Sequence, residues 1–189
     1  DFCLSRGLGD VYKRQPQAVA MGVADLGIVG YNEVLERGYD VDIAQRLGFG
    51  GCRISLAIPK AEKYDGLSYF SGKRIATSYP NILRRYFTEK GIDAEIHTIA
   101  GSVEIAPAVG MADAIFDIVS SGGTLVQNGL VEVERVVESE AVLIAGKELA
   151  PEKKSLLNQL CFRFESIEQS RDMKYVLMNL SLIHISEPT

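Results

Sequence analysis

Residues 113–125 read Asp-Ala-Ile-Phe-Asp-Ile-Val-Ser-Ser-Gly-Gly-Thr-Leu. An apolar run is followed by a turn of small residues and then by a helical pattern. This order predicts a buried strand, a glycine-containing turn and the start of a helix. Because side chains alternate along a strand, Asp113, Ile115 and Asp117 share one face, so Asp117 lies close to the turn.

The turn at residues 120–124 has the composition of an anion-binding site. Glycine lets a ligand approach the backbone, the N–H groups at a helix start point toward it, and Ser121 and Thr124 add hydroxyl donors. A purely structural connection between strand and helix fits this turn equally well. Neither a GKS or GKT P-loop ending nor a GxGxxG dinucleotide fingerprint accompanies it.

Further strands and helices are predicted before and after residues 113–125. Strands are expected at 23–29, 53–58, 73–77, 94–99, 113–119, 131–137 and 141–145. Helices are expected at 32–37 with Asn32 as N-cap, after Pro80, and at 103–109, 124–128 and 151–173. Strands that alternate with helices predict an α/β fold with largely parallel sheets.

A sequence motif that occurs twice in the chain indicates two lobes. Gly22-Val-Ala-Asp25 and Gly110-Met-Ala-Asp113 each precede an apolar strand, a glycine-bearing turn and a helix. Two similar lobes would each offer a strand end to a shared cleft. Ligands of open α/β sheets bind outside the carboxyl ends of the strands, so the function is expected there.

Composition excludes several classes of function. A net charge of −5 disfavours a nucleic-acid surface, and the absence of an 18-residue apolar run disfavours a membrane span. Cys3, Cys52 and Cys161 are widely spaced, which favours free thiols in a reducing cytoplasm. His97 stands in an alternating run and is expected on a strand surface. Arg84 and Arg85 are expected to be solvated.

The two ends differ from the middle of the chain. Residues 1–15 and 181–189 resemble translated sequencing-adapter sequence and fit no element that the adjoining chain needs. Residues 16–180 are therefore taken as the native part.

The spacing of residues from Glu104 through Gly110, Asp117 and Ser121 to Leu125 resembles the signature of ATP phosphoribosyltransferases. The resemblance extends through residues 25–32, 48–59, 72–81, 128–130 and 170–179. It implies a two-lobed, type II periplasmic-binding-protein-like α/β fold, with mostly parallel sheets and a cleft between the lobes. The Gly-Gly-Cys-Arg motif that ends at Arg53 resembles the long form of the enzyme rather than the short form, which needs a partner subunit.

The resemblance also implies a reaction. N1 of ATP attacks C1 of phosphoribosyl pyrophosphate and displaces pyrophosphate with Mg²⁺ bound. This chemistry needs positioning and charge stabilisation rather than a protein nucleophile, which agrees with the lack of a Ser-His-Asp or Cys-His set.

The resemblance assigns roles to thirteen residues. The ribose 5′-phosphate is expected at Ser121, Gly122, Gly123, Thr124 and Leu125, and the ribose hydroxyls near Asp117 and Glu104, with Asp117 also a candidate ligand of Mg²⁺. Arg53 either contacts ATP phosphates or pyrophosphate, or forms a surface ion pair. The nucleotide side is expected at Asp25, Asn32, Thr77, Ser78 and Tyr79, of which Tyr79 either stacks on a base or caps a helix.

The expected organisation is a first lobe of residues 16–67 plus about 155–180, and a second lobe of residues 68–154. The resemblance implies a first strand and a glycine-arginine loop at the nucleotide site, which nothing before Pro16 matches, and a C-terminal regulatory domain, which is expected to be absent. A poorly active chain without histidine feedback is therefore expected. The full-length protein is expected to be a cytoplasmic homo-oligomer. Two alternatives are a type II solute-binding module and a paralogue without catalysis. The ligand that the chain binds distinguishes the enzyme from the solute-binding module, since only the enzyme should bind phosphoribosyl pyrophosphate with Mg²⁺ at the turn.

Overall fold

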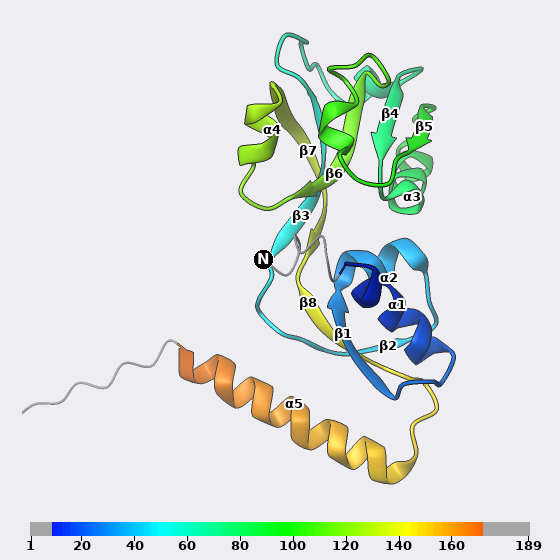
Figure 1. Ribbon diagram of the computed structural model, residues 1–189, viewed down its shortest axis with the longest axis vertical. Coiled ribbons are helices and arrows are strands. Elements are labelled where there is room, and N and C mark those ends of the chain that lie inside the picture. Colours follow the sequence, from blue (N-terminus) through cyan, green and yellow to red (C-terminus); the bar gives the residue numbers. More distant parts are fainter. Residues whose placement is uncertain (1–8, 172–189) are drawn as a thin grey trace, which may run out of the picture.

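The computed structural model describes residues 9–171, which form two lobes (Figure 1). The smaller, first lobe has a three-stranded sheet in the order β1-β8-β2, and the larger, second lobe a five-stranded sheet in the order β5-β4-β6-β3-β7. The first lobe comprises α1 (Gly9–Ala20), β1 (Leu26–Gly30), α2 (Tyr31–Arg37), β2 (Asp42–Arg46), β8 (Ala141–Ala145) and α5 (Pro151–Arg171). The second comprises β3 (Cys52–Pro59), η1 (Leu67–Phe70), β4 (Arg74–Thr77), α3 (Pro80–Lys90), β5 (Glu95–Thr98), η2 (Val103–Ile105), β6 (Ala114–Val119), α4 (Gly123–Gln127) and β7 (Leu130–Ser139).

The larger sheet is buried on both faces. Strand β6 sends Ala114 and Phe116 into one hydrophobic cluster, which includes Leu83 and Phe87 of α3. Ile115 and Val119 of β6 enter a second cluster on the opposite face, together with Leu125 of α4. Burial on both faces is why this strand is a continuous apolar run rather than an alternating one.

The smaller lobe is built around β8, whose five residues are all buried. Val142 and Ile144 pack against Val19 of α1 and Val34 of α2 on one face. Ala141 and Leu143 face the other way and are covered by α5. One central strand thus organises both layers of the lobe.

The chain crosses between the lobes twice, from β2 to β3 and from β7 to β8. The backbone N–H of Leu47 donates to the carbonyl of Ala141, and that of Ala141 donates to Phe49. Glu140 accepts from Arg46 at 2.9 Å and from the Gly48 N–H at 3.1 Å. The two crossings are therefore bonded to each other.

The two-lobed α/β fold is confirmed, with two differences in its organisation. Largely parallel sheets are expected, but only the larger sheet contains parallel pairs, those of β4 with β5 and β6, and it is mixed because β3 runs antiparallel to β6 and β7. The smaller sheet is antiparallel, because β1 and β2 both run against β8. The antiparallel pairing comes from β3 and β8, the strands that follow the two crossings between the lobes. The same strands shift the lobe boundaries from those predicted at 67 and 154, because β3 belongs to the second sheet and β8 to the first.

Most predicted elements are present. The first exception is β2, which was not predicted. The second is Asn32, which lies inside α2 instead of capping it, since Gly30 is the N-cap. The third is the helix expected at 103–109, which is reduced to η2. Helix α1 begins at Gly9 and so includes part of the 1–15 segment, while residues 1–8 and 181–189 lie outside the described residues.

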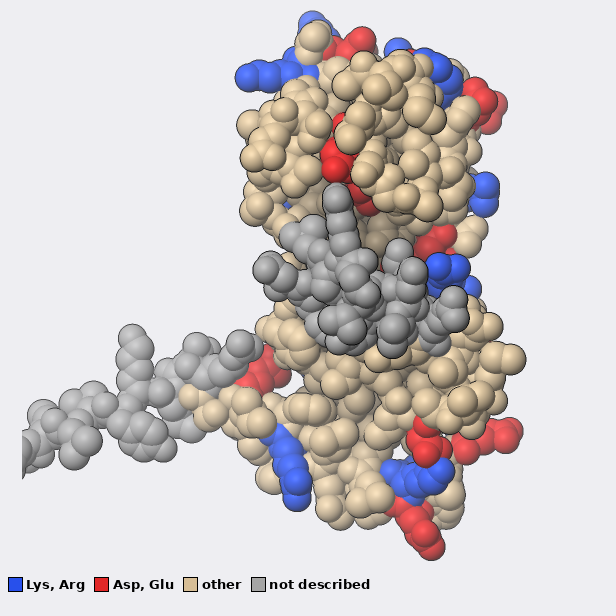
Figure 2. Space-filling view, in the orientation of Figure 1, with Lys and Arg blue, Asp and Glu red and all other residues tan. Residues whose placement is uncertain are grey.

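No helix within residues 9–171 combines the length and apolar character needed to cross a bilayer. On the face shown in Figure 2, basic and acidic side chains are interspersed.

Two phenylalanines provide a matched test of the core. Phe70 is fully buried with its ring 6.0 Å from that of Phe87, whereas Phe162 of α5 is 69% exposed. Phe70→Ala should lower the free energy of unfolding by about 3–5 kcal/mol, because it leaves a cavity. Phe162→Ala should change it by less than about 0.5 kcal/mol. Urea denaturation followed by circular dichroism measures both, and equal effects would contradict the assigned core.

Candidate functional site

Three parallel strands end at one edge of the larger sheet. Thr77 of β4 lies beside Thr98 of β5 and Phe116 of β6, so their carboxyl ends point the same way. The connections after β4, β5 and β6 therefore meet at this carboxyl edge. Carboxyl edges are where open α/β sheets bind ligands.

The connection after β6 is the turn at residues 120–124. Gly122 has φ +81°, a conformation that residues with a Cβ rarely adopt, and its carbonyl accepts from the Val126 N–H at 3.2 Å to start α4. Ser121, Gly123 and Thr124 are exposed. Leu125 is buried, so its side chain anchors the turn in the core and only its backbone can face a ligand. The turn therefore presents hydroxyl and first-turn N–H groups at the carboxyl edge.

Arg53 lies against this turn. Its Nη1 donates to the carbonyl of Ser120 at 3.0 Å, while Nε and Nη2 donate to both carboxylate oxygens of Glu132 at 2.6 Å. Ser55 donates to the same carboxylate at 2.9 Å. Bidentate pairing fixes the plane of a guanidinium, so Glu132 holds Arg53 beside the turn. The ion pair weighed in the sequence analysis is thus present, and it places the arginine at the candidate site.

The bonds from Arg53 hold the pKa of Glu132 down to about 2, against the opposing effect of burial, with a further contribution from Ser55. Glu132 therefore remains a carboxylate at neutral pH. A fixed anion behind Arg53 orients its charge but also neutralises part of it.

Asp117 and Glu104 are the two candidate carboxylates. Asp117 is half-buried on β6 opposite Ser55 of β3, on the face that carries Arg53. Glu104 is half-buried in η2, which packs against β6. Ser102, just before η2, has a positive φ of 53°, an uncommon conformation for a residue with a side chain. Within residues 9–171, no three His, Cys, Asp or Glu side chains form a metal-binding group.

The connection after β4 reaches the first lobe. Asn32 donates through Nδ2 to the Tyr79 hydroxyl at 3.2 Å, and its Oδ1 accepts from the Ser139 hydroxyl at 2.8 Å. Tyr79 is buried and also donates to Glu33 at 3.5 Å. Burial raises the pKa of Tyr79 far above its ordinary value, and the charges of Glu33 and Asp117 add to this, so the phenol stays protonated.

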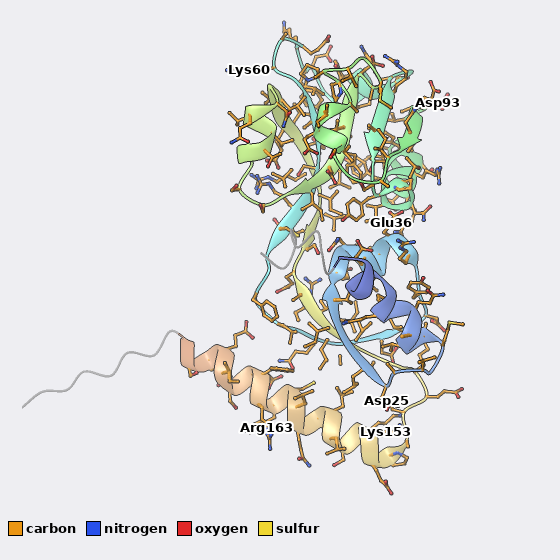
Figure 3. All side chains as sticks on the ribbon, viewed as in Figure 1. Asp25, Glu36, Lys60, Asp93, Lys153 and Arg163 are labelled. Carbon is orange, nitrogen blue, oxygen red and sulfur yellow. The ribbon has the colours of Figure 1, made fainter. Side chains whose placement is uncertain are left out.

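The remaining nucleotide-side candidates fall into two groups. The Thr77 side chain is fully buried and accepts from the Tyr79 N–H at 2.8 Å, and Ser78 donates to the Ile99 carbonyl at 2.9 Å, so both stabilise the carboxyl edge. Asp25 is not brought to that edge. Figure 3 places it with Lys153 at the outer end of the first lobe, where the two form an ion pair at 2.7 Å.

Sequence reasoning did not identify Glu132, Ser55 or Ser139. Their common property is that each acts through a partner on another strand or helix. The alternation of β7 marked Glu132 only as one of several acidic residues. The register that brings it to Arg53 depends on irregularities in the β3–β7 pairing, which no local pattern encodes.

Two lobes, a mixed larger sheet and an exposed turn of small residues at its carboxyl edge define a type II periplasmic-binding-protein-like fold. Comparison with known proteins identifies the family within this fold class. The family model described as HisG, ATP phosphoribosyltransferase, matches residues 13–166. The chain belongs to the ATP phosphoribosyltransferase family.

Relatives support this assignment. An ATP phosphoribosyltransferase from Phocaeicola vulgatus is 58% identical over 91% of this chain and 61% of its own length. One from Bacteroides fragilis is 59% identical over 87% of this chain and 58% of its own length. The chain thus spans about three fifths of the curated relatives it matches.

Solved structures agree in fold. A Thermotoga maritima ATP phosphoribosyltransferase HisG:HisZ complex matches with a TM-score of 0.73 and 27% identity, over 84% of this chain and 77% of that chain. The substrate-binding protein of an amino-acid ABC transporter matches with a TM-score of 0.60, over 84% of this chain and 71% of that chain. At 17% identity, the second shows the fold alone.

The Arg53–Glu132 pair predicts a pH-dependent contribution to stability. Because the folded-state pKa of about 2 is below the ordinary 4.5, the contribution is complete above about pH 4.5 and disappears as the pH falls through 2. Glu132→Gln should therefore lower the free energy of unfolding by about 1–3 kcal/mol at pH 7 and by much less near pH 2.

Urea denaturation between pH 7 and pH 2 measures this difference. Glu138→Gln is the matched control, because Glu138 is an exposed carboxylate on the same strand. A Glu132 effect that stays constant down to pH 2 would contradict the assigned ion pair.

Proposed function

We propose that this chain carries the phosphoribosyl pyrophosphate site of an ATP phosphoribosyltransferase, the enzyme that joins N1 of ATP to C1 of phosphoribosyl pyrophosphate as the first step of histidine biosynthesis. Family membership supports the reaction, and the exposed turn at residues 120–124 supports the location of the site. The ribose 5′-phosphate would accept hydrogen bonds from Ser121, Thr124 and the backbone N–H groups of Gly123, Thr124 and Leu125.

Charge stabilisation is the main task of the site. As the bond from C1 to pyrophosphate breaks, positive charge develops on the ribose and negative charge on the leaving group. Asp117 and Glu104 would hold the ribose hydroxyls and face the positive charge. Arg53, held beside the turn by Glu132 and Ser120, would face the negative charge.

Asp117 is also the proposed contact for Mg²⁺. This ion is commonly held by one or two carboxylates together with substrate phosphates, so a single carboxylate near a diphosphate fits its chemistry. The ion would neutralise negative charge on the pyrophosphate as it leaves.

The nucleotide would lie between the carboxyl edge and the first lobe. Tyr79, Ser78 and Asn32 are the proposed residues on that side. Asp25 is not included, because it pairs with Lys153 at the outer end of the first lobe (Figure 3). We further propose a cytoplasmic homo-oligomer of the long form for the full-length protein. Solute binding without catalysis is less favoured, because the solute-binding matches share the fold at under 20% identity.

Ligand titration tests the proposed turn. The chain should bind phosphoribosyl pyrophosphate in the presence of Mg²⁺, as measured by isothermal titration calorimetry. The double variant Ser121→Ala with Thr124→Val should raise the Kd roughly tenfold or more. It removes two hydrogen-bond donors to a charged phosphate, each of which contributes at most about 1.5–3 kcal/mol to the binding free energy. Thr88→Val, an exposed threonine on α3, should leave the Kd unchanged. Equal affinities for all three proteins would argue against the turn.

An activity assay tests the reaction itself. The chain would be joined to the flanking regions of the Bacteroides fragilis relative and supplied with ATP, Mg²⁺ and phosphoribosyl pyrophosphate. Formation of the adduct is followed by ultraviolet absorbance. Tight binding of an amino acid or an oxyanion, without adduct, would favour the solute-binding alternative.

A further inference from the structure

Helix α3 begins without a cap from its own segment. Its N-cap residue is Tyr79, whose side chain makes no capping hydrogen bond, and Pro80 occupies the first helical position. The backbone N–H groups of Asn81 and Ile82 are therefore donors that α3 leaves without a local partner.

Glu36 of the first lobe supplies the missing acceptor. Its Oε1 and Oε2 accept from the Asn81 N–H at 3.0 and 3.1 Å, and Oε2 also accepts from the Ile82 N–H at 3.0 Å. The side chain is 7% exposed, and Figure 3 shows Glu36 between the two lobes. A carboxylate at a helix N-terminus interacts favourably with the helix dipole, and burial strengthens charge-assisted bonds.

The bonding runs in both directions. Asn81 donates through Nδ2 to the carbonyl of Glu36 at 3.1 Å, and Arg85 donates to the carbonyl of Leu35. Arg85, expected to be solvated, is thus a partner of the first lobe. Each helix satisfies terminal backbone groups of the other.

Asn32 and Glu36 are one helical turn apart on α2, so they share a face. That face meets Tyr79 through Asn32 and the first turn of α3 through Glu36. We define the α2–α3 clasp as the contacts of Asn32 and Glu36 with Tyr79, Asn81 and Ile82. Asn32 adjoins the β7–β8 crossing, because its Oδ1 accepts from the Ser139 hydroxyl, whereas Glu36 bonds to the first turn of α3 and to neither crossing. Two crossings alone permit a hinge between lobes, and the Glu36 bonds, which lie one helical turn farther along α2, restrain it.

We propose that Glu36 is a positioning residue, whose carboxylate closes the α2–α3 clasp and fixes the distance between the first lobe and the carboxyl edge. The clasp itself does not depend on the proposed function. Its effect on catalysis does, because ATP and phosphoribosyl pyrophosphate would have to meet across the same boundary.

Spin labels test the clasp directly. Asp40 of the first lobe and Asp93 of the second are exposed and would be replaced by cysteine, with the native cysteines replaced by serine. Electron–electron double resonance on the full chain should give a narrow distance distribution. Glu36→Ala should broaden it, and Glu36→Gln, which keeps the shape and one acceptor oxygen, should broaden it less. Glu89→Ala, which removes an exposed carboxylate of α3, should leave it unchanged.

A local role for Glu36 predicts a different result. If Glu36 only capped α3, Glu36→Ala would lower the melting temperature and leave the distance distribution narrow, which would overturn the clasp. If Glu36→Ala does not fold, the Glu36→Gln distribution decides the question alone, since an unchanged width would overturn the proposal.

Kinetics then test the positioning role in the protein extended to the length of its relatives. Glu36→Gln should lower kcat by roughly tenfold to a hundredfold, because the two substrates are misaligned. The KM for phosphoribosyl pyrophosphate should change little, since the turn lies wholly within the second lobe. A normal kcat with a broadened distribution would refute the positioning role and retain the clasp. An inactive parent protein would refute the proposed function and leave the spin-label result valid.

Discussion

The pairing of β3 with both β6 and β7 is the constraint on which the rest of the structure depends. This strand leaves the first lobe and becomes an interior strand of the larger sheet between β6 and β7, so it both links the lobes and builds that sheet. Its antiparallel register sets Arg53 opposite Val119, the last residue of β6. The same pairing brings Glu132 of β7 to the guanidinium. The turn after β6 therefore acquires its cationic neighbour from sheet topology, not from any residue within the turn.

Much of the fold follows from local sequence, and what does not follow is non-local. Apolar runs and helix ends such as Pro80 and Gly91 are local signals, because burial and backbone conformation act on neighbouring residues. Strand direction depends on which strands cross between the lobes. An alternation of helices and strands suggested parallel pairing, yet β3 and β8 each change lobes and run antiparallel to their neighbours. The lobe boundaries shifted for the same reason.

The candidate site also has features that follow from local sequence and features that do not. The turn at residues 120–124 could be predicted as a connection from strand to helix, because glycine and hydroxyl residues after an apolar strand favour a turn, whereas the same residues fit a structural turn and an anion site equally well. The repeated motif that contains Asp25 and Asp113 does not lie at the carboxyl ends of its strands. Both aspartates precede their strands, so they lie at the amino ends, where Asp25 pairs with Lys153 and Asp113 with Arg74. The carboxyl ends of β1 and β6, which lead into α2 and α4, are the opposite ones. The repeated motif thus indicates two lobes, but it marks the amino end of a strand in each and not the carboxyl end.

Tyr79 shows how the inter-lobe boundary limits what the nucleotide side can do. Its phenol bonds to Asn32 and Glu33, and its ring is buried at the start of α3. An aromatic ring stacks on a base only when one of its faces is accessible, so a stacking role would require the α2–α3 contact to separate. A hydrogen-bonding role would not, because Asn32, Tyr79 and Ser139 already form a connected polar path between the lobes. Stacking by Tyr79 and the closed α2–α3 clasp therefore exclude each other, because the same clasp that holds the Tyr79 hydroxyl through Asn32 keeps its ring buried.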